Sequence, residues 1–133
     1  MISAVGDELP PREFGPISRT GIVRYQGASG DFNPIHHDEE FARAAGLPTV
    51  LSVGMLQAGY LATYCADLFG PENVRRFRVR FRDRVFPGDV LTCRGTVADV
   101  TDDGGATLVS LELSVERAPG ETVVSGSAVF VAV

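Results

Sequence analysis

The spacing of hydrophobic residues changes once along this chain, from helical in the first half to alternating in the second. Apolar positions in residues 53–69 occupy nearly all sides of a helical projection, which predicts a long helix buried on most sides. Gly70-Pro71 ends this pattern, because proline cannot continue a helix. Two shorter helices are predicted before it, over residues 20–26 and 38–45, each behind a residue type that caps helix N-termini.

In the second half, hydrophobic residues alternate with polar ones, the period of a strand with one buried and one solvated face. The first such segment, residues 76–85, alternates aromatic residues or valine with arginine. Three longer segments follow, over residues 90–100, 106–117 and 122–133, separated by stretches rich in Gly, Pro and Asp. Four strands with short connections predict an antiparallel sheet. With the preceding buried helix, they predict an α+β fold.

Composition narrows the class of protein. The 133 residues and 14.2 kDa fit one domain, 1–133, and the hydrophobic share of 44% is that of a globular protein. A net charge of −5 argues against partners such as nucleic acid or an anionic membrane. The polar residues 1–11 lack the features of a signal peptide, and residues 50–69 are too polar to span a bilayer. Cys65 and Cys93 have no paired spacing, which predicts buried free thiols in a reducing, cytoplasmic compartment.

One polar turn joins an acid to an imidazole. Asp31 precedes His36 by five positions, and Gly30, Asn33 and Pro34 restrict the backbone between them. A turn this constrained holds two side chains in one mutual geometry, as a general acid/base pair requires. These residue types also suit a well-capped loop with no chemistry, so composition alone leaves both interpretations open.

The order of the motifs favours the catalytic interpretation. The string S-G-D-x-N-P-I-H-x-D, then F-A-R-x-x-G, then G-M-L, resembles the MaoC-like, or (R)-specific, enoyl-CoA hydratase family over Tyr25 to Leu56. The resemblance implies the hot-dog fold, a curved antiparallel sheet wrapped around a long central helix. It also implies reversible hydration of a 2-enoyl thioester to the (R)-3-hydroxyacyl thioester, by an enzyme without a cofactor or metal.

The resemblance also implies roles for residues and partners. Asp31 and His36 would be the catalytic pair that shares one water, and the Gly54 N–H would stabilise the thioester oxygen as an oxyanion donor. The substrate would be carried by CoA or by an acyl carrier protein. The assembly would be a homodimer with its site at the interface, or a heteromer with a related MaoC-like subunit.

The chain departs from the family pattern at one position. It has Ser52-Val53-Gly54-Met55 where the family commonly has Ala-His-Gly-Met, so Val53 supplies no hydrogen-bonding side chain. Ser52 is either a loop cap or a substrate contact. Two alternatives to a self-sufficient hydratase remain at this stage. One is a hot-dog thioesterase, and the other is a subunit of a heteromeric hydratase, active or acyl-binding only.

Two further features have a functional and a plain structural interpretation. His37 lies next to His36, but adjacent side chains in an extended turn point apart, so we predict no metal site. The arginines between residues 76 and 84 could attract the phosphates of CoA or phosphopantetheine. The interpretation that we favour at this stage is a solvated strand face that also deters aggregation.

Overall fold

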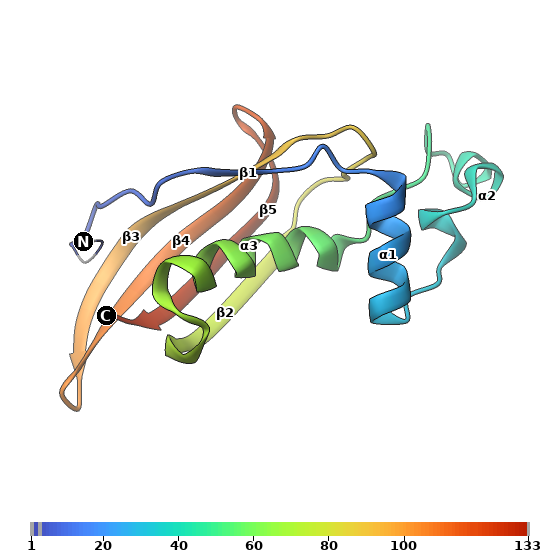
Figure 1. Cartoon of the computed structure of the whole chain (residues 1–133). Helices are drawn as coiled ribbons and strands as arrows, with labels where there is room; N and C mark the ends of the chain where they lie inside the picture. The colour runs from blue at the N-terminus through green and yellow to red at the C-terminus, as the bar shows by residue number, and fades with distance from the viewer. Residues whose placement is uncertain (1, 3, 133) are drawn as a thin grey trace.

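The computed structural model describes residue 2 and residues 4–132. Five strands form one antiparallel sheet in the order β1-β3-β4-β5-β2. The strands are β1 (Arg12–Phe14), β2 (Val74–Phe81), β3 (Leu91–Asp103), β4 (Ala106–Ala118) and β5 (Glu121–Val131). The sheet is curved, and the helix α3 (Gly54–Phe69) lies along its concave side (Figure 1). This is the α+β hot-dog architecture that the resemblance implies.

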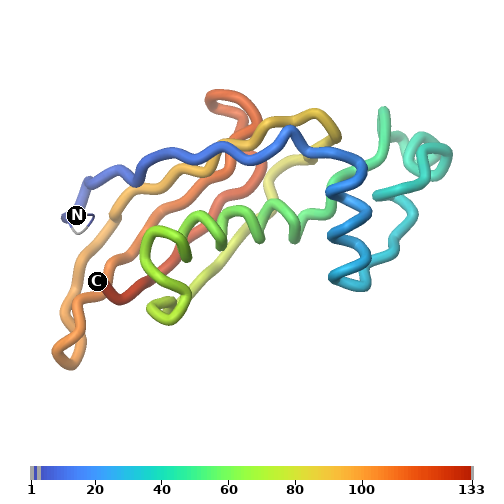
Figure 2. Tube along the Cα trace, in the orientation of Figure 1, coloured from blue at the N-terminus to red at the C-terminus, as the bar shows by residue number. Residues whose placement is uncertain are grey.

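The remaining helices gather beyond the N-terminal end of α3, as the Cα trace shows (Figure 2). They are α1 (Arg19–Ser29), the 3₁₀ turn η1 (Pro34–His36) and α2 (Glu39–Ala44); a second 3₁₀ turn, η2 (Pro71–Asn73), follows α3. The predicted helix at 20–26 is present and longer. Its predicted cap, Thr20, is wrong, because Ser18 caps the helix by accepting from the Gly21 N–H. The predicted cap of α2 is confirmed, since Asp38 accepts from the Phe41 N–H.

The four predicted strands are present, with two differences at the sheet edges. β2 ends at Phe81 rather than near Val85, because the N–H groups of Arg82 and Asp83 both turn to the carbonyl of Val123. β1 was not predicted; it has three residues and exists only through its pairing with β3. β2 pairs with β5 alone, so its other edge is open in the single chain.

One face of α3 packs into the main core. Its fully buried members are Gln57, Ala58, Leu61, Tyr64, Cys65 and Phe69. A line of residues on the opposite side, including Met55, Gly59 and Thr63, is exposed. The predicted burial on most sides thus holds except for this line. Cys65 and Cys93 are both buried free thiols, as predicted, and burial raises the pKa of each to about 12.

Close packing between β2 and β5 gives a stability prediction. A Cβ at Gly126 would lie 2.8 Å from the carbonyl oxygen of Arg78, so Gly126→Ala must shift one strand. We expect this variant to lose about 1–3 kcal/mol of unfolding free energy in urea denaturation. Gly27 in α1 has no atom within 4 Å of such a Cβ, and Gly27→Ala is expected to gain up to about 1 kcal/mol. Equal midpoints for the two variants would contradict this packing.

Candidate active site

An acid and an imidazole face one another in the loop that joins α1 to α2. The Nε2 atom of His36 lies 3.8 Å from the Oδ2 atom of Asp31. The His36 side chain is 10% exposed and that of Asp31 is 44% exposed, so the pair is open to solvent from the Asp31 side. The separation is too long for a direct hydrogen bond. One water can instead bind to both groups.

The orientation of the His36 ring is set by its other nitrogen. His36 Nδ1 lies 2.6 Å from the carbonyl oxygen of Leu51, and because a carbonyl can only accept, Nδ1 carries the proton and donates it. When the ring is neutral, Nε2 is therefore the nitrogen without a proton, and it faces Asp31. The Leu51 N–H also donates to the carbonyl of Ile35, at 3.0 Å. Two hydrogen bonds therefore fasten η1 to the segment that leads into α3.

The turn that carries the pair is braced by local hydrogen bonds. Gly30 ends α1 with a φ of 76°, a left-handed angle that favours glycine. Asp31 Oδ1 accepts from the Asn33 N–H at 3.2 Å, and Asn33 Oδ1 accepts from the Ile35 N–H at 3.0 Å. Pro34 then occupies the first turn of η1, where its missing N–H costs nothing. The three predicted supporting residues thus lie around the pair.

A buried glutamine that sequence reasoning missed holds this turn from behind. Gln26 of α1 is only 2% exposed. Its Nε2 donates to the carbonyls of Asp31, at 2.9 Å, and Asn33, at 3.2 Å, and its Oε1 accepts from His37 Nδ1 at 3.3 Å. Its burial could have been predicted from the sequence, because Gln26 lies four residues after Ile22 and therefore on the same, core-facing side of α1.

The other predicted residues lie at the N-terminus of α3. Gly54 is the first residue of this 16-residue helix, so its N–H has no carbonyl partner within the helix. A Cβ there would lie 3.2 Å from the ring of Phe81. Ser52 is buried and donates through Oγ to Gln57 Oε1 at 2.8 Å, which makes it part of the loop's internal bonding. Val53 is buried in the main core, so its side chain contributes packing.

Large apolar side chains next to these residues are exposed. Phe32, next to Asp31 in the sequence, is 65% exposed. Met55, next to Gly54, is 55% exposed, and Phe81, whose ring lies beside Gly54, is 51% exposed. Cavities of about 260–630 Å³ lie elsewhere on the described part of the chain, and neither Asp31 nor His36 is among their lining residues. The single chain therefore leaves the Asp31–His36 pair at an open apolar surface.

Within residues 2 and 4–132, no group of three or more His, Cys, Asp or Glu side chains is arranged to hold a metal ion. Within the same residues, no helix has both the length and the apolar character needed to cross a bilayer.

Comparisons with known proteins agree on one family. The model of the MaoC like domain matches residues 3–117. The UPF0336 protein of Thermobifida fusca is 30% identical, over 93% of this chain and 86% of its own length. The peroxisomal enoyl-CoA hydratase 2 of Arabidopsis thaliana is 38% identical over 66 residues, which are 47% of this chain and only 21% of that protein. The structure of the R-hydratase PhaJ1 from Pseudomonas aeruginosa, in its unliganded form, superposes on this chain with a TM-score of 0.85. The match covers 97% of this chain and 81% of that one at 24% sequence identity, and it supports the fold.

Proposed function

The chain belongs to the MaoC-like domain family, and from this membership we propose that residues 1–133 form one hydratase domain. Its reaction is the reversible addition of water to a 2-enoyl thioester, which gives the (R)-3-hydroxyacyl thioester. The observation that carries the proposal is the facing of Asp31 and His36 at 3.8 Å, with the Nδ1 proton of His36 committed to Leu51. The similarity to a protein named enoyl-CoA hydratase 2 supports the same reaction.

The geometry suits each step of the hydration. A water bound between the Asp31 carboxylate and His36 Nε2 loses a proton to the pair as its oxygen bonds to the β-carbon of the substrate. The α-carbon then takes a proton from the pair. One O–H bond and the C=C π bond are broken, and one C–O bond and one C–H bond are made. Between these events the thioester oxygen carries enolate charge. In our proposal the Gly54 N–H, at the positive end of α3, stabilises that charge.

This chemistry uses only acid–base groups and a backbone donor, and it requires no metal or other cofactor. CoA or an acyl carrier protein serves as the handle of the substrate. The proposal is tested by following loss of the conjugated enoyl thioester with purified protein, while a thiol reagent reports any free thiol. Formation of the 3-hydroxyacyl thioester supports a hydratase. Release of thiol without hydration would instead indicate the thioesterase alternative.

We infer that the active form is a homodimer in which the partner covers the Asp31–His36 surface. Two features support this: the exposed apolar side chains of Phe32, Met55 and Phe81, and the unpaired edge of β2. In a monomer both would remain in contact with water. Sedimentation at micromolar concentration is expected to show at least a dimer. A fully active monomer would contradict the inference. Activity that appears only with a related MaoC-like subunit would indicate the heteromeric alternative.

The two buried free thiols suit the reducing conditions of the cytoplasm, which we propose as the location.

An apolar cavity beside α3 supports a long acyl group as the substrate. The cavity has a volume of about 280 Å³ and is lined by Ala62, Ala66, Pro71, Val74, Phe77 and Phe130. Ala62 lies eight residues after Gly54, which is about 12 Å along the helix axis. A chain that extends from a thioester at Gly54 along α3 would end there.

Filling this cavity gives a substrate-length prediction. Wild-type kcat/KM is expected to be more than ~10-fold higher for a ten-carbon enoyl-CoA than for crotonyl-CoA, since each buried methylene contributes about 0.8 kcal/mol. Ala62→Phe should remove most of that preference, because the ring occupies the cavity. Crotonyl-CoA is the internal control and should keep its kcat/KM in the variant. Equal losses for both substrates would mean that the cavity does not accept the acyl tail.

A further inference from the structure

Positive charge in this acidic chain is concentrated on one strand and the turn after it. Residues 75–84 contain six arginines and one aspartate, a net charge of +5. Because the whole chain has a net charge of −5, the remaining residues together carry −10. The positive field is therefore local to β2 and to the surface around it.

The alternation of β2 places these arginines on the side of the sheet that faces away from α3. Phe77 and Val79 pack against the main core, so Arg78 and Arg80 project to the opposite side. The neighbouring strand β5 sets a serine beside each arginine, with Arg78 opposite Ser127 and Arg80 opposite Ser125. Just after β2, Arg82 donates through Nε to Ser125 Oγ at 2.9 Å.

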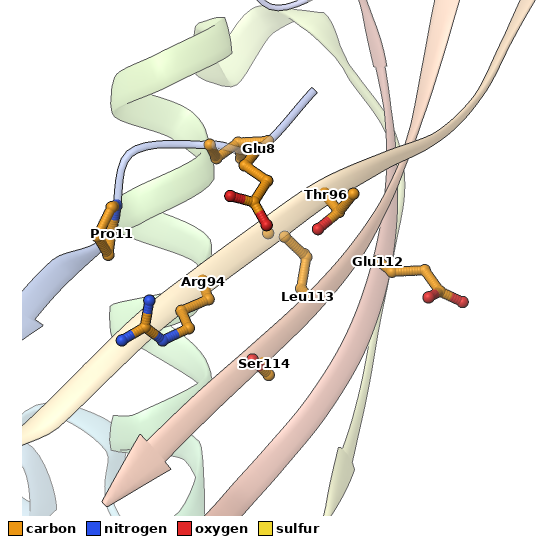
Figure 3. A pocket seen from close by; sticks show the side chains of 9 residues that line it. Glu8, Pro11, Arg94, Thr96, Glu112, Leu113 and Ser114 are labelled. Atoms are coloured by element: carbon orange, nitrogen blue, oxygen red, sulfur yellow. The ribbon is translucent and has the colours of Figure 1, made fainter. Parts of the chain in front are cut away.

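These side chains border a groove of about 630 Å³. Its lining is Arg78, Val79, Arg80, Arg82, Glu112, Leu113, Ser125, Gly126 and Ser127. Small serine and glycine residues form its floor, and the arginines form one wall. A second cavity of about 340 Å³ adjoins it and shares Glu112 and Leu113; Figure 3 shows this cavity on the outer side of the sheet, with α3 behind the strands.

Within the described residues, the arginines of this groove have no acidic side chain at ion-pair distance. Elsewhere the structure pairs Arg12 with Asp67 and Arg117 with Asp83. Among residues 2 and 4–132, Arg78, Arg80 and Arg82 form no ion pair of this kind. Three guanidinium groups, two hydroxyls and a single carboxylate, that of Glu112, thus line one open groove.

We propose that this groove binds a ligand with two or more linked phosphate groups, as in a nucleoside diphosphate. The guanidinium group matches phosphate oxygens with two parallel hydrogen bonds, and serine hydroxyls add further donors. Alternate residues on a strand lie about 6.6–6.8 Å apart, so a row of three guanidinium groups matches several linked phosphates better than a single one. Glu112 on the opposite wall repels anions and keeps the phosphates on the arginine side.

Two sources share this chemistry. One is the nucleotide part of a CoA thioester, and this version rests on the proposed hydratase function. The other is a free nucleotide that binds at a distance from the Asp31–His36 pair, and this version does not depend on that function.

Calorimetric titration with inorganic pyrophosphate, ADP and orthophosphate tests the groove on the full chain. Wild type is expected to bind pyrophosphate and ADP more tightly than orthophosphate. The double variant Arg78→Gln/Arg80→Gln should bind pyrophosphate and ADP at least ~10-fold more weakly than wild type. The matched control is Arg24→Gln with Arg43→Gln, two exposed arginines elsewhere that change the net charge equally. Absence of pyrophosphate binding to wild type, or equal weakening in both double variants, would overturn the proposal.

Kinetics with crotonyl-CoA and with crotonyl-pantetheine, which lacks phosphate, separate the two sources. A rise in KM for the CoA thioester alone in the Arg78/Arg80 double variant assigns the groove to the substrate's nucleotide. Unchanged KM values together with lost pyrophosphate binding assign it to a free nucleotide. If wild type hydrated neither thioester, the proposed function would fail, while the titration would still decide the groove.

Discussion

Replacement of Asp31 by Asn is expected to lower kcat for hydration by ~10²- to 10⁴-fold, the usual loss when a general acid or base is removed. The amide cannot take a proton from the water shared with His36. Its oxygen can still accept from the Asn33 N–H, so the turn should keep its shape. Turnover of the preferred enoyl thioester is the measurement, and urea denaturation checks that the variant is folded.

His36→Ala should cause a loss of similar size, because the two residues act on the same water. For the same reason the double variant is expected to be little slower than either single one, since groups that act as a unit have non-additive effects. Glu40→Gln is a matched carboxylate-to-amide control at an exposed position of α2, and it should keep wild-type kcat. Near wild-type turnover in Asp31→Asn or His36→Ala would remove this pair from the mechanism.

The fold was predictable where local sequence determines it. The Asp38 cap, Gly70-Pro71 at the end of α3 and the turn residues between the strands each act on their own few neighbours. β1 was not predicted, because its three residues are too few to show an alternating pattern and form a strand only by pairing with β3. The end of β2 likewise depends on Val123, which lies 41 residues after Arg82 in the sequence.

The candidate site divides in the same way. The motif placed Asp31 and His36 together because they lie on one turn, and the structure brings them within 3.8 Å. It did not reveal that Leu51, fifteen residues away, orients the imidazole. Nor did it reveal that Ser52 and Val53 are buried, since burial depends on how the segment before α3 packs. Contacts between distant segments of the chain were the part that sequence patterns could not supply.

Gln26 is the supporting contact with the largest expected effect on the site. Gln26→Leu preserves the approximate size of the side chain, yet it leaves the carbonyls of Asp31 and Asn33 without their buried donor. Loss of a buried hydrogen-bond partner costs about 1–3 kcal/mol, so the unfolding free energy should fall by that amount. The turn would then be free to shift. We expect kcat to drop by ~10-fold or more, because displacements of about 1 Å at a reacting group have costs of this order.

A control variant is needed to distinguish a positioning effect of Gln26→Leu from a simple loss of stability. Ile22→Val removes a methyl group from the buried side of the same helix, should cost about 0.5–1.5 kcal/mol, and touches none of the hydrogen bonds to the turn. Both variants are measured where each is fully folded. If Gln26 positions the pair, kcat falls in Gln26→Leu with KM nearly unchanged, while Ile22→Val keeps both. In an Asp31→Asn background, Gln26→Leu should then add little further loss, because the turn no longer holds a complete Asp31–His36 pair to misplace. Equal kcat in Gln26→Leu and Ile22→Val would reduce Gln26 to a packing role.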